Sequence, residues 1–179
     1  REGKRAAEAL CFDYLRAGRA DVRVARIFNT YGPRMQPDDR RIVSNLIVQA
    51  LNGEPLTVYG NGRQTRSFCH VSDLVRGLLA MMEVERTPPG PVNLGNPAEV
   101  AVLDLALAVQ RMIPNGSQIV FCPLPADDPR RRRPDITRAR EVLGWSPQVP
   151  LARGLAEAAG WFRLHGRIAV TQAQKRPAE

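Results

Sequence analysis

The sequence is poor in the residues that build metal centres and disulfide frameworks. Among its 179 residues there are two histidines and three cysteines, and the cysteines form no C-x-x-C pair. Such a set argues against a zinc site, and we expect no metal centre. It favours free thiols in a reducing, cytoplasmic compartment. We also expect Cys11, Cys69 and Cys122 to be buried as small hydrophobic side chains.

Long apolar runs and a nucleotide-binding glycine motif are also absent from the sequence. No run approaches the ~18 apolar residues of a membrane-spanning helix, so we expect no membrane span. The first residues show no signal-peptide pattern. No G-x-x-G-x-x-G motif occurs. Gly60 and Gly62 lie in a predicted hairpin-like turn that opens no helix, so they are not a pyrophosphate-binding fingerprint.

Positive charge is the strongest bias in the composition. The formal net charge is +8 at pH 7, which invites a nucleic-acid interpretation. However, arginines are spread along the chain, and the aromatic residues, 6% of the total, do not alternate with the one tight cluster at 130–133. No base-stacking surface is predicted, and we expect no nucleic-acid partner. A nucleotide diphosphate would also use arginines, as bidentate donors.

The stretch 22–35, V-R-V-A-R-I-F-N-T-Y-G-P-R-M, organises the rest of the chain. Its apolar residues predict a strand at 21–28 that is buried on both faces, as in a parallel sheet covered by helices. Because ligands bind beyond the carboxyl ends of such strands, Asn29 and Thr30 are candidates to face a ligand. The alternative is a plain exit from the strand, with Asn29 capping backbone groups. The pattern alone leaves both interpretations open.

The remaining periodicity alternates between helices and strands, which predicts the α/β class. Polar residues without periodicity at 166–179 predict a disordered tail, and 123–134 is predicted to be a loop. Helices are predicted at 1–18, 42–52, 74–84, 102–113, 135–143 and 151–164, and strands at 21–28, 55–59, 64–71, 91–94 and 118–122.

Several polar residues stand out within these elements. Arg66 is predicted in a strand beside Phe68, where a guanidinium needs either an acidic partner or a phosphate, and both remain open. Ser44 and Asn45 lie near the start of a helix, where free N–H groups can bind an anion. Lys4 by itself is an ordinary solvated helix lysine. Its helix has no N-cap and no preceding strand, so we interpret the chain as a piece of a longer protein.

Longer motifs carry a resemblance to a known family. The runs E-G-K-R-A-A-E and V-R-V-A-R-I-F-N-T-Y-G-P-R-M resemble the extended short-chain dehydrogenase/reductases, or NAD-dependent epimerase/dehydratases, that act on nucleotide sugars. The runs R-R-I-V-S-N-L-I-V-Q-A-L-N-G-E-P-L-T-V-Y-G-N-G-R-Q-T-R-S-F, V-N-L-G-N-P and D-D-P-R-R-R-R-P-D-I are most similar to UDP-glucuronic acid decarboxylases, also called UDP-xylose synthases. The resemblance covers roughly residues 1–163.

The resemblance implies the C-terminal part of a Rossmann-type parallel sheet plus a small α/β substrate-binding domain. Residues 1–33 and about 65–98 would end the NAD-binding domain, whose N-terminal half would lie upstream. Residues 34–64 and about 99–165 would bind the UDP-sugar substrate. The intact enzyme would be a cytoplasmic homodimer that uses NAD.

The resemblance also implies roles for individual residues. Lys4 would be the lysine of a Y-x-x-x-K pair that holds the nicotinamide ribose, with the tyrosine directly before Arg1. Arg132 would clamp the diphosphate and approach the carbon that loses its carboxylate. His70 stands where the family usually has a tyrosine, a tolerated exchange beside the site. The cofactor-binding residues would be Lys4, Thr30 and Arg41, and the substrate-binding residues Tyr14, Asn29, Ser44, Asn45, Tyr59, Gln64, Arg66 and Arg132.

The implied reaction converts UDP-glucuronate to UDP-xylose through a 4-keto intermediate. An alternative within the superfamily is another nucleotide-sugar epimerase or 4,6-dehydratase. A third possibility is a non-catalytic nucleotide-sugar-binding or scaffold fragment, because the glycine fingerprint and the tyrosine are missing from this chain. For the same reason we expect the chain alone to be inactive.

Overall fold

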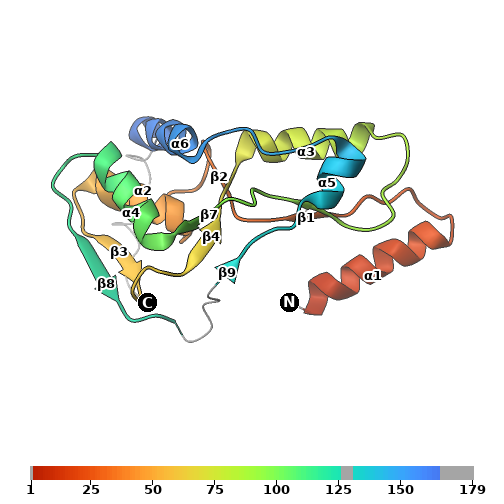
Figure 1. The fold of residues 1–179 in the computed structure, drawn as a ribbon, viewed down its shortest axis with the longest axis horizontal. Coiled ribbons are helices and arrows are strands. Elements are labelled where there is room, and N and C mark those ends of the chain that lie inside the picture. Colours follow the sequence, from red (N-terminus) through yellow and green to blue (C-terminus); the bar gives the residue numbers. More distant parts are fainter. Residues whose placement is uncertain (1, 126–130, 166–179) are drawn as a thin grey trace.

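The protein is a mixed α/β structure, as predicted (Figure 1). A computed structural model describes residues 2–125 and 131–165, so the predicted disordered tail at 166–179 lies outside the described residues. The helices are α1 Glu2–Arg16, α2 Ile42–Asn52, α3 Val71–Glu83, α4 Val102–Met112, α5 Thr137–Leu143 and α6 Leu151–His165. The strands are β1 Ala25–Ile27, β2 Thr30–Tyr31, β3 Leu56–Tyr59, β4 Thr65–Ser67, β5 Cys69–His70, β6 Val92–Leu94, β7 Glu99–Ala101, β8 Ile119–Cys122 and β9 Arg131–Arg132.

Most strand pairs are parallel and join segments far apart in sequence. β1 pairs with β6, β2 with β5 and β3 with β8, all in parallel. β4 lies between β7, which is antiparallel to it, and β9, which is parallel. Parallel pairs with helical connections are typical of α/β folds, so the topology agrees with the predicted class.

The prediction of a strand at 21–28 buried on both faces is wrong in extent and in burial. β1 covers three residues, and the Ile27 side chain is 56% exposed. Arg26 and Ile27 are both exposed, so neither face of β1 is covered at these residues, and β6 is its one partner strand among the described residues. α1 likewise buries none of its side chains and lies apart from the other helices (Figure 1). Arg26 on β1 holds Glu8 of α1, Nε to Oε2 at 2.9 Å, and this hydrogen bond lowers the pKa of Glu8.

Three further predictions are corrected by long-range pairing. The predicted strand at 64–71 is divided into β4 and β5, which belong to different sheets. The turn at Gly60 and Gly62 does not close a hairpin, because β3 pairs with β8 rather than with β4. The loop predicted at 123–134 contains β9, and β7 was not expected. Each of these strands is stabilised by a partner distant in sequence, which local periodicity does not reveal.

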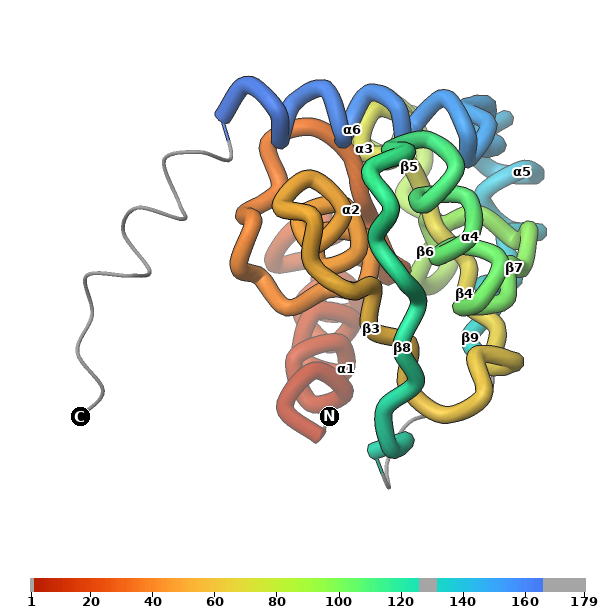
Figure 2. Tube along the Cα trace, turned by 90° about the vertical axis from the view of Figure 1, so that its left-hand side faces the viewer, coloured from red at the N-terminus to blue at the C-terminus, as the bar shows by residue number. Residues whose placement is uncertain are grey.

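Two hydrophobic clusters form the interior. The larger one packs α2, β3, α4 and α6 together, and Figure 2 shows α6 running across α2 and α4. The smaller one joins β5, α3, β6 and α5. The larger contains Tyr31, Val43, Leu46, Ile47, Ala50, Leu56, Val58, Phe68, Val102, Leu105, Ala106, Val109, Ile113, Leu155, Ala158, Ala159 and Phe162; the smaller contains Cys69, Leu74, Met81, Val92, Leu94, Ile136, Ala139 and Trp145.

A buried carboxylate ties α3 to the segment between α5 and α6. Asp73 is 1% exposed, and its Oδ2 accepts hydrogen bonds from the backbone N–H groups of Gln148, at 3.0 Å, and Val149, at 2.9 Å. Its Oδ1 accepts from Arg76 at 2.8 Å, and its backbone carbonyl accepts from Trp145 Nε1 at 2.9 Å. These hydrogen bonds offset the free-energy cost of burying the carboxylate, and they hold the segment that leads into α6 against α3.

We expect Asp73→Ala to lower the free energy of unfolding by about 3 kcal/mol. The substitution removes the acceptor of the Gln148 and Val149 N–H groups, and it removes one of the acceptors of the Arg76 guanidinium. Urea denaturation measures the change. Asp38→Ala, at an exposed aspartate, is the control and should change stability by less than ~0.5 kcal/mol. Equal effects of the two substitutions would contradict the assigned role of Asp73.

The open edge of β1 predicts self-association of this chain. An exposed strand edge with apolar side chains is a template for pairing with another chain. We expect light scattering to detect oligomers that decrease with dilution, and Ile27→Lys to shift the distribution toward monomer. A monodisperse monomer of the unsubstituted chain at high concentration would rule out this expectation.

Candidate functional site

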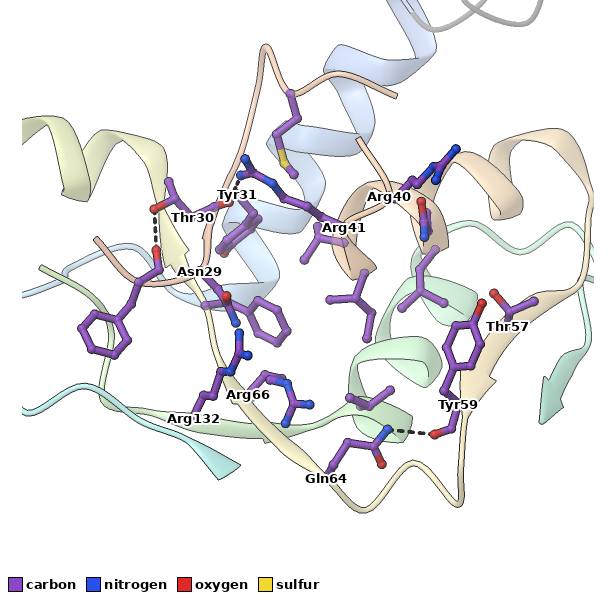
Figure 3. Close-up of a pocket in the computed structure, with 18 of the residues that line it drawn as sticks. Asn29, Thr30, Tyr31, Arg40, Arg41, Thr57, Tyr59, Gln64, Arg66 and Arg132 are labelled. Carbon is purple, nitrogen blue, oxygen red and sulfur yellow. Dashed lines mark hydrogen bonds between the residues drawn. The ribbon is translucent and has the colours of Figure 1, made fainter. Parts of the chain in front are cut away.

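A cavity of about 640 Å³ brings together most of the predicted site residues (Figure 3). It lies where α1, the connection between β1 and β2, the start of α2, and the strands β3, β4 and β9 meet. Its lining includes Lys4, Asn29, Thr30, Arg41, Asn45, Tyr59, Gln64, Arg66 and Arg132. Residues separated by more than 120 positions in sequence therefore share one site.

Two of the predicted substrate-binding residues do not line this cavity. Tyr14 projects from α1 with 51% of its side chain exposed. Ser44 is fully buried, and its hydroxyl donates to the backbone carbonyl of Arg41, at 2.9 Å, and to the carboxylate of Asp39. Its contacts are therefore those of a residue that stabilises the first turn of α2.

Asn29 and Thr30 lie at the end of β1, as predicted. The backbone carbonyl of Asn29 accepts from the N–H of Cys69 at 2.9 Å, which holds the strand end against β5. The side chain of Asn29 makes no hydrogen bond within the described ranges and lies beside Arg132 in Figure 3. This placement favours the ligand-facing interpretation over backbone capping. The hydroxyl of Thr30 donates to the carbonyl of Phe28 at 2.8 Å.

Arg66 and Arg132 are neighbours across two parallel strands. The β4–β9 register pairs their Cα atoms, and both side chains line the cavity. Arg66 is 8% exposed and donates from Nη1 to the carbonyl of Thr65 at 2.8 Å, whereas Arg132 is exposed. Like charges at paired positions are unfavourable in a sheet. An anion bound between the two guanidinium groups would offset this repulsion and accept hydrogen bonds from both.

Arg41 is held at the start of α2 by a residue that the sequence interpretation missed. Its Nε lies 3.3 Å from Oδ2 of Asp39, and its backbone N–H donates to Oδ1 of the same carboxylate at 3.0 Å. Its Nη1 lies 3.4 Å from the carbonyl of Thr30. Asp39 therefore positions Arg41 over the end of β1. An aspartate just before a predicted helix start was the available signal.

Another wall of the cavity is built from β3 and the turn after it. Gln64 Nε2 donates to the carbonyl of Tyr59 at 2.8 Å, which closes the turn. Gly62 has φ of 71°, and a Cβ atom there would lie 2.8 Å from Cβ of Leu103. A side chain is therefore excluded at position 62. Tyr59 is 48% exposed and presents a ring face at the cavity.

His70 lies behind the cavity wall rather than in it. Its ring is 3% exposed and packs edge-to-face on Tyr31, with ring centroids 5.5 Å apart. Nδ1 lies 2.8 Å from Oγ of Ser72, and Nε2 lies 3.5 Å from Oε2 of Glu157. Tyr31 itself lines the cavity, and burial raises the pKa of its phenol far above the ordinary value, so it remains protonated.

The charges around the cavity have one sign. In the described part of the chain, the lining contains one lysine and four arginines but no carboxylate, which predicts an anionic ligand. Arg40 belongs to this set and was not singled out from the sequence, because a loop pattern does not reveal where an arginine points. The cationic residues are Lys4, Arg40, Arg41, Arg66 and Arg132.

The cysteines agree only partly with expectation. All three are free, as predicted. Cys69 is fully buried, but Cys11 and Cys122 are only half-buried, so the expectation of burial is wrong for those two. They lie on α1 and β8, elements that are partly exposed along their length.

Two further features were sought in residues 2–125 and 131–165. No cluster of three or more histidine, cysteine or acidic side chains able to hold a metal ion occurs there. No helix in those ranges is both long enough and apolar enough to cross a membrane.

Comparison with models of known protein families identifies a family that includes this chain. Residues 2–95 match the model of the NAD dependent epimerase/dehydratase family. The chain belongs to this family. The match runs from α1 through β6 and so includes both sides of the cavity around Asn29 and Arg66.

A curated relative of this epimerase/dehydratase chain is UDP-glucuronic acid decarboxylase 4 of Arabidopsis thaliana. The two are 58% identical over 162 residues, which are 90% of this chain and 36% of that protein. Seven further curated relatives, from Arabidopsis thaliana, Xenopus tropicalis and Danio rerio, are also UDP-glucuronic acid decarboxylases, at 51–58% identity. The chain spans less than half the length of each of these eight relatives.

Solved structures of similar proteins share the fold. The epimerase Mth375 of Methanothermobacter thermautotrophicus superposes with a TM-score of 0.86 at 29% identity, over 92% of this chain and 49% of that one. The UDP-glucuronic acid 4-epimerase of Bacillus cereus, solved in complex with UDP-glucuronic acid and NAD, gives 0.80 at 29% identity, over 88% and 50%. The Rossmann-type α/β class predicted from the sequence is thereby confirmed.

The burial of Cys69 makes a prediction about its reactivity. Burial raises the pKa of its thiol to about 12, and the thiolate is the reactive form. At about pH 8, we expect iodoacetamide to alkylate the half-buried Cys11 and Cys122 within minutes, and Cys69 only after denaturation. Peptide mass spectrometry measures each site. Native-state labelling of Cys69 as fast as Cys122 would contradict the placement of β5 in the core.

Proposed function

We propose that this chain is the C-terminal part of an NAD-dependent UDP-glucuronate decarboxylase, which converts UDP-glucuronate to UDP-xylose through a 4-keto intermediate. The observation that carries the proposal is the pairing of Arg66 with Arg132 at a cavity lined by cations, which suits a diphosphate. The names of the relatives, at 51–58% identity, supply the sugar and the reaction.

The residues of the cavity would bind different parts of the ligand. Arg66 and Arg132 would clamp the diphosphate, because guanidinium groups bind phosphate oxygens bidentately. Tyr59 would pack against the uridine, with Gln64 nearby. The residues assigned to the rest of the nucleotide sugar are Asn29 and Asn45 in the cavity, together with Ser44 and Tyr14 outside it. Ser44 would act indirectly, by supporting the start of α2 beside Asn45, and Tyr14 would contact the sugar only in an assembly.

The cofactor would contact this chain at its nicotinamide end. Lys4, Thr30 and Arg41 line the same cavity, and the Lys4 ammonium could hold a ribose hydroxyl. These residues fit that end of NAD, whereas the sequence carries no glycine-rich motif for its pyrophosphate. We therefore propose that this chain alone binds the nucleotide sugar without turning it over.

Bound NAD would supply the hydride acceptor that makes the sugar C4 a ketone, and the hydride donor that restores the alcohol. The residues of this chain would orient the sugar so that C4 faces the nicotinamide. Arg132 would also approach the carbon that loses its carboxylate. There its positive charge would stabilise the negative charge that develops as carbon dioxide departs.

A division into two domains accompanies this function. We propose that residues 1–33 and about 65–98 complete the NAD-binding domain, and that residues 34–64 and about 99–165 form the substrate domain. The two hydrophobic clusters support this division only in part. Tyr31 and Phe68 pack in the larger cluster with the proposed substrate domain, and Ala139 of α5 packs in the smaller cluster with α3 and β6.

Arg132→Ala tests the diphosphate clamp against a matched neighbour. Loss of charge-assisted hydrogen bonds should weaken the binding of UDP-glucuronate about tenfold or more. Arg133→Ala removes the adjacent arginine, which does not line the cavity and lies 3.9 Å from Glu99, and should change the affinity less than about twofold. Isothermal titration of this chain measures both. Equal losses of affinity in the two variants would indicate a general electrostatic attraction of the ligand rather than hydrogen bonding of the diphosphate by Arg132.

A second candidate is a UDP-glucuronate epimerase, favoured by the structural similarity to the Bacillus cereus enzyme. The two reactions differ in mass balance. A decarboxylase releases carbon dioxide and a lighter sugar, whereas an epimerase forms an isomer of unchanged mass. Mass spectrometry of the product made by the full-length enzyme distinguishes them.

For the intact enzyme we also propose a cytoplasmic homodimer. Free cysteines suit a reducing compartment. The exposed apolar side chains Leu10 and Tyr14 on α1 offer a surface that a second copy could cover. Light scattering of the full-length enzyme measures its oligomeric state.

A further inference from the structure

Two arginines in the segment between β2 and α2 adopt a left-handed backbone conformation. Arg34 has φ of 69° and Arg40 has φ of 59°. Glycine or asparagine usually occupies such positions, because a larger side chain is strained there. Strained residues persist where the surroundings over-determine them, and they cluster at ligand sites. The two arginines therefore form a natural pair for comparison.

Their positions relative to the cavity differ. Arg40 lines the cavity, whereas Arg34 does not. Both side chains are exposed. Within the described ranges, neither guanidinium takes part in a hydrogen bond or an ion pair, unlike the neighbouring Arg41, which is held by Asp39. Arg40 thus presents a positive charge to the cavity that no carboxylate of the described chain neutralises.

Arg40 also extends the distribution of positive charge around the cavity. Figure 3 shows it beside the start of α2, on the side away from Arg66 and Arg132. A ligand held by that pair would therefore have cationic groups on two sides. Because cavity walls of low dielectric constant focus the field, a charge at the rim raises the local concentration of anions.

We propose that Arg40 is a further binding residue for the anionic nucleotide sugar. It acts by Coulomb attraction on the negative groups of the ligand, the diphosphate or the sugar carboxylate, from the wall opposite Arg66. The inference rests on the proposed function for the identity of the ligand. It also accounts for an arginine at a backbone position that glycine would occupy with less strain.

The test compares three variants of this chain by titration with UDP-glucuronate and with UDP-glucose. Arg40→Gly removes both charge and strain, Arg40→Lys keeps both, and Arg34→Gly removes charge and strain away from the cavity. At low salt we expect Arg40→Gly to weaken binding of UDP-glucuronate about threefold. Arg40→Lys and Arg34→Gly should stay within about 1.5-fold of the unsubstituted chain. The loss should shrink in ~0.5 M NaCl, because the charge is exposed.

Thermal unfolding separates strain from binding. Relief of strain should raise Tm by a similar amount, about 2 °C, in Arg40→Gly and Arg34→Gly. Only Arg40→Gly should lose affinity.

The outcomes distinguish the parts of the proposal. A loss for both ligands assigns Arg40 to the diphosphate, and a loss for UDP-glucuronate alone assigns it to the carboxylate; either supports the inference. Unchanged affinity in Arg40→Gly, or an equal loss in Arg34→Gly, overturns it while the proposed function stands. If the unsubstituted chain binds neither ligand, the proposed function fails, and this inference fails with it.

Discussion

The pairing of Arg66 with Arg132 is the constraint around which the cavity is built. Both guanidinium groups line the cavity from paired positions of neighbouring strands, so an anion in the cavity could accept hydrogen bonds from both. The strand β4 places Arg66 there because β7 and β9 fix its two edges. The register of β4 and β9 therefore places these two arginines side by side, and the loops around the cavity contribute further lining residues.

The interior explains how these strands are held in position. Phe68, which lies between β4 and β5, packs in the larger cluster, whereas the next residue, Cys69 of β5, packs in the smaller one. Asp73 then secures α3 to the segment that leads into α6. The cavity lies against the larger cluster, and Tyr31, Leu46 and Phe68 of that cluster line it.

The family relationship and the geometry answer different questions. The family relationship places the chain among NAD dependent epimerases and dehydratases, and its relatives include both an epimerase and decarboxylases. The cavity adds local detail that the relationship does not provide. Asp39 orients Arg41, and Arg40 adds a cation in a strained conformation. Such features distinguish this site from a generic Rossmann-type cleft.

The sequence by itself determined the α/β class, the helix α2 with its predicted bounds, and the candidates Asn29, Arg66 and Arg132. It could do so because helical periodicity is local, and because the motif residues are recognisable in order. It also indicated that free cysteines and an anionic ligand should be expected.

Only the tertiary structure determined which of the candidate residues line one cavity. It separated Ser44 and Tyr14 from the cavity, added Asp39 and Arg40, and created β7 and β9 from segments without a strand pattern. It also showed that β1 is three residues long, with β6 as its partner strand among the described residues. The physical reason is that strand pairing and side-chain direction depend on partners distant in sequence, whose contribution no local pattern contains.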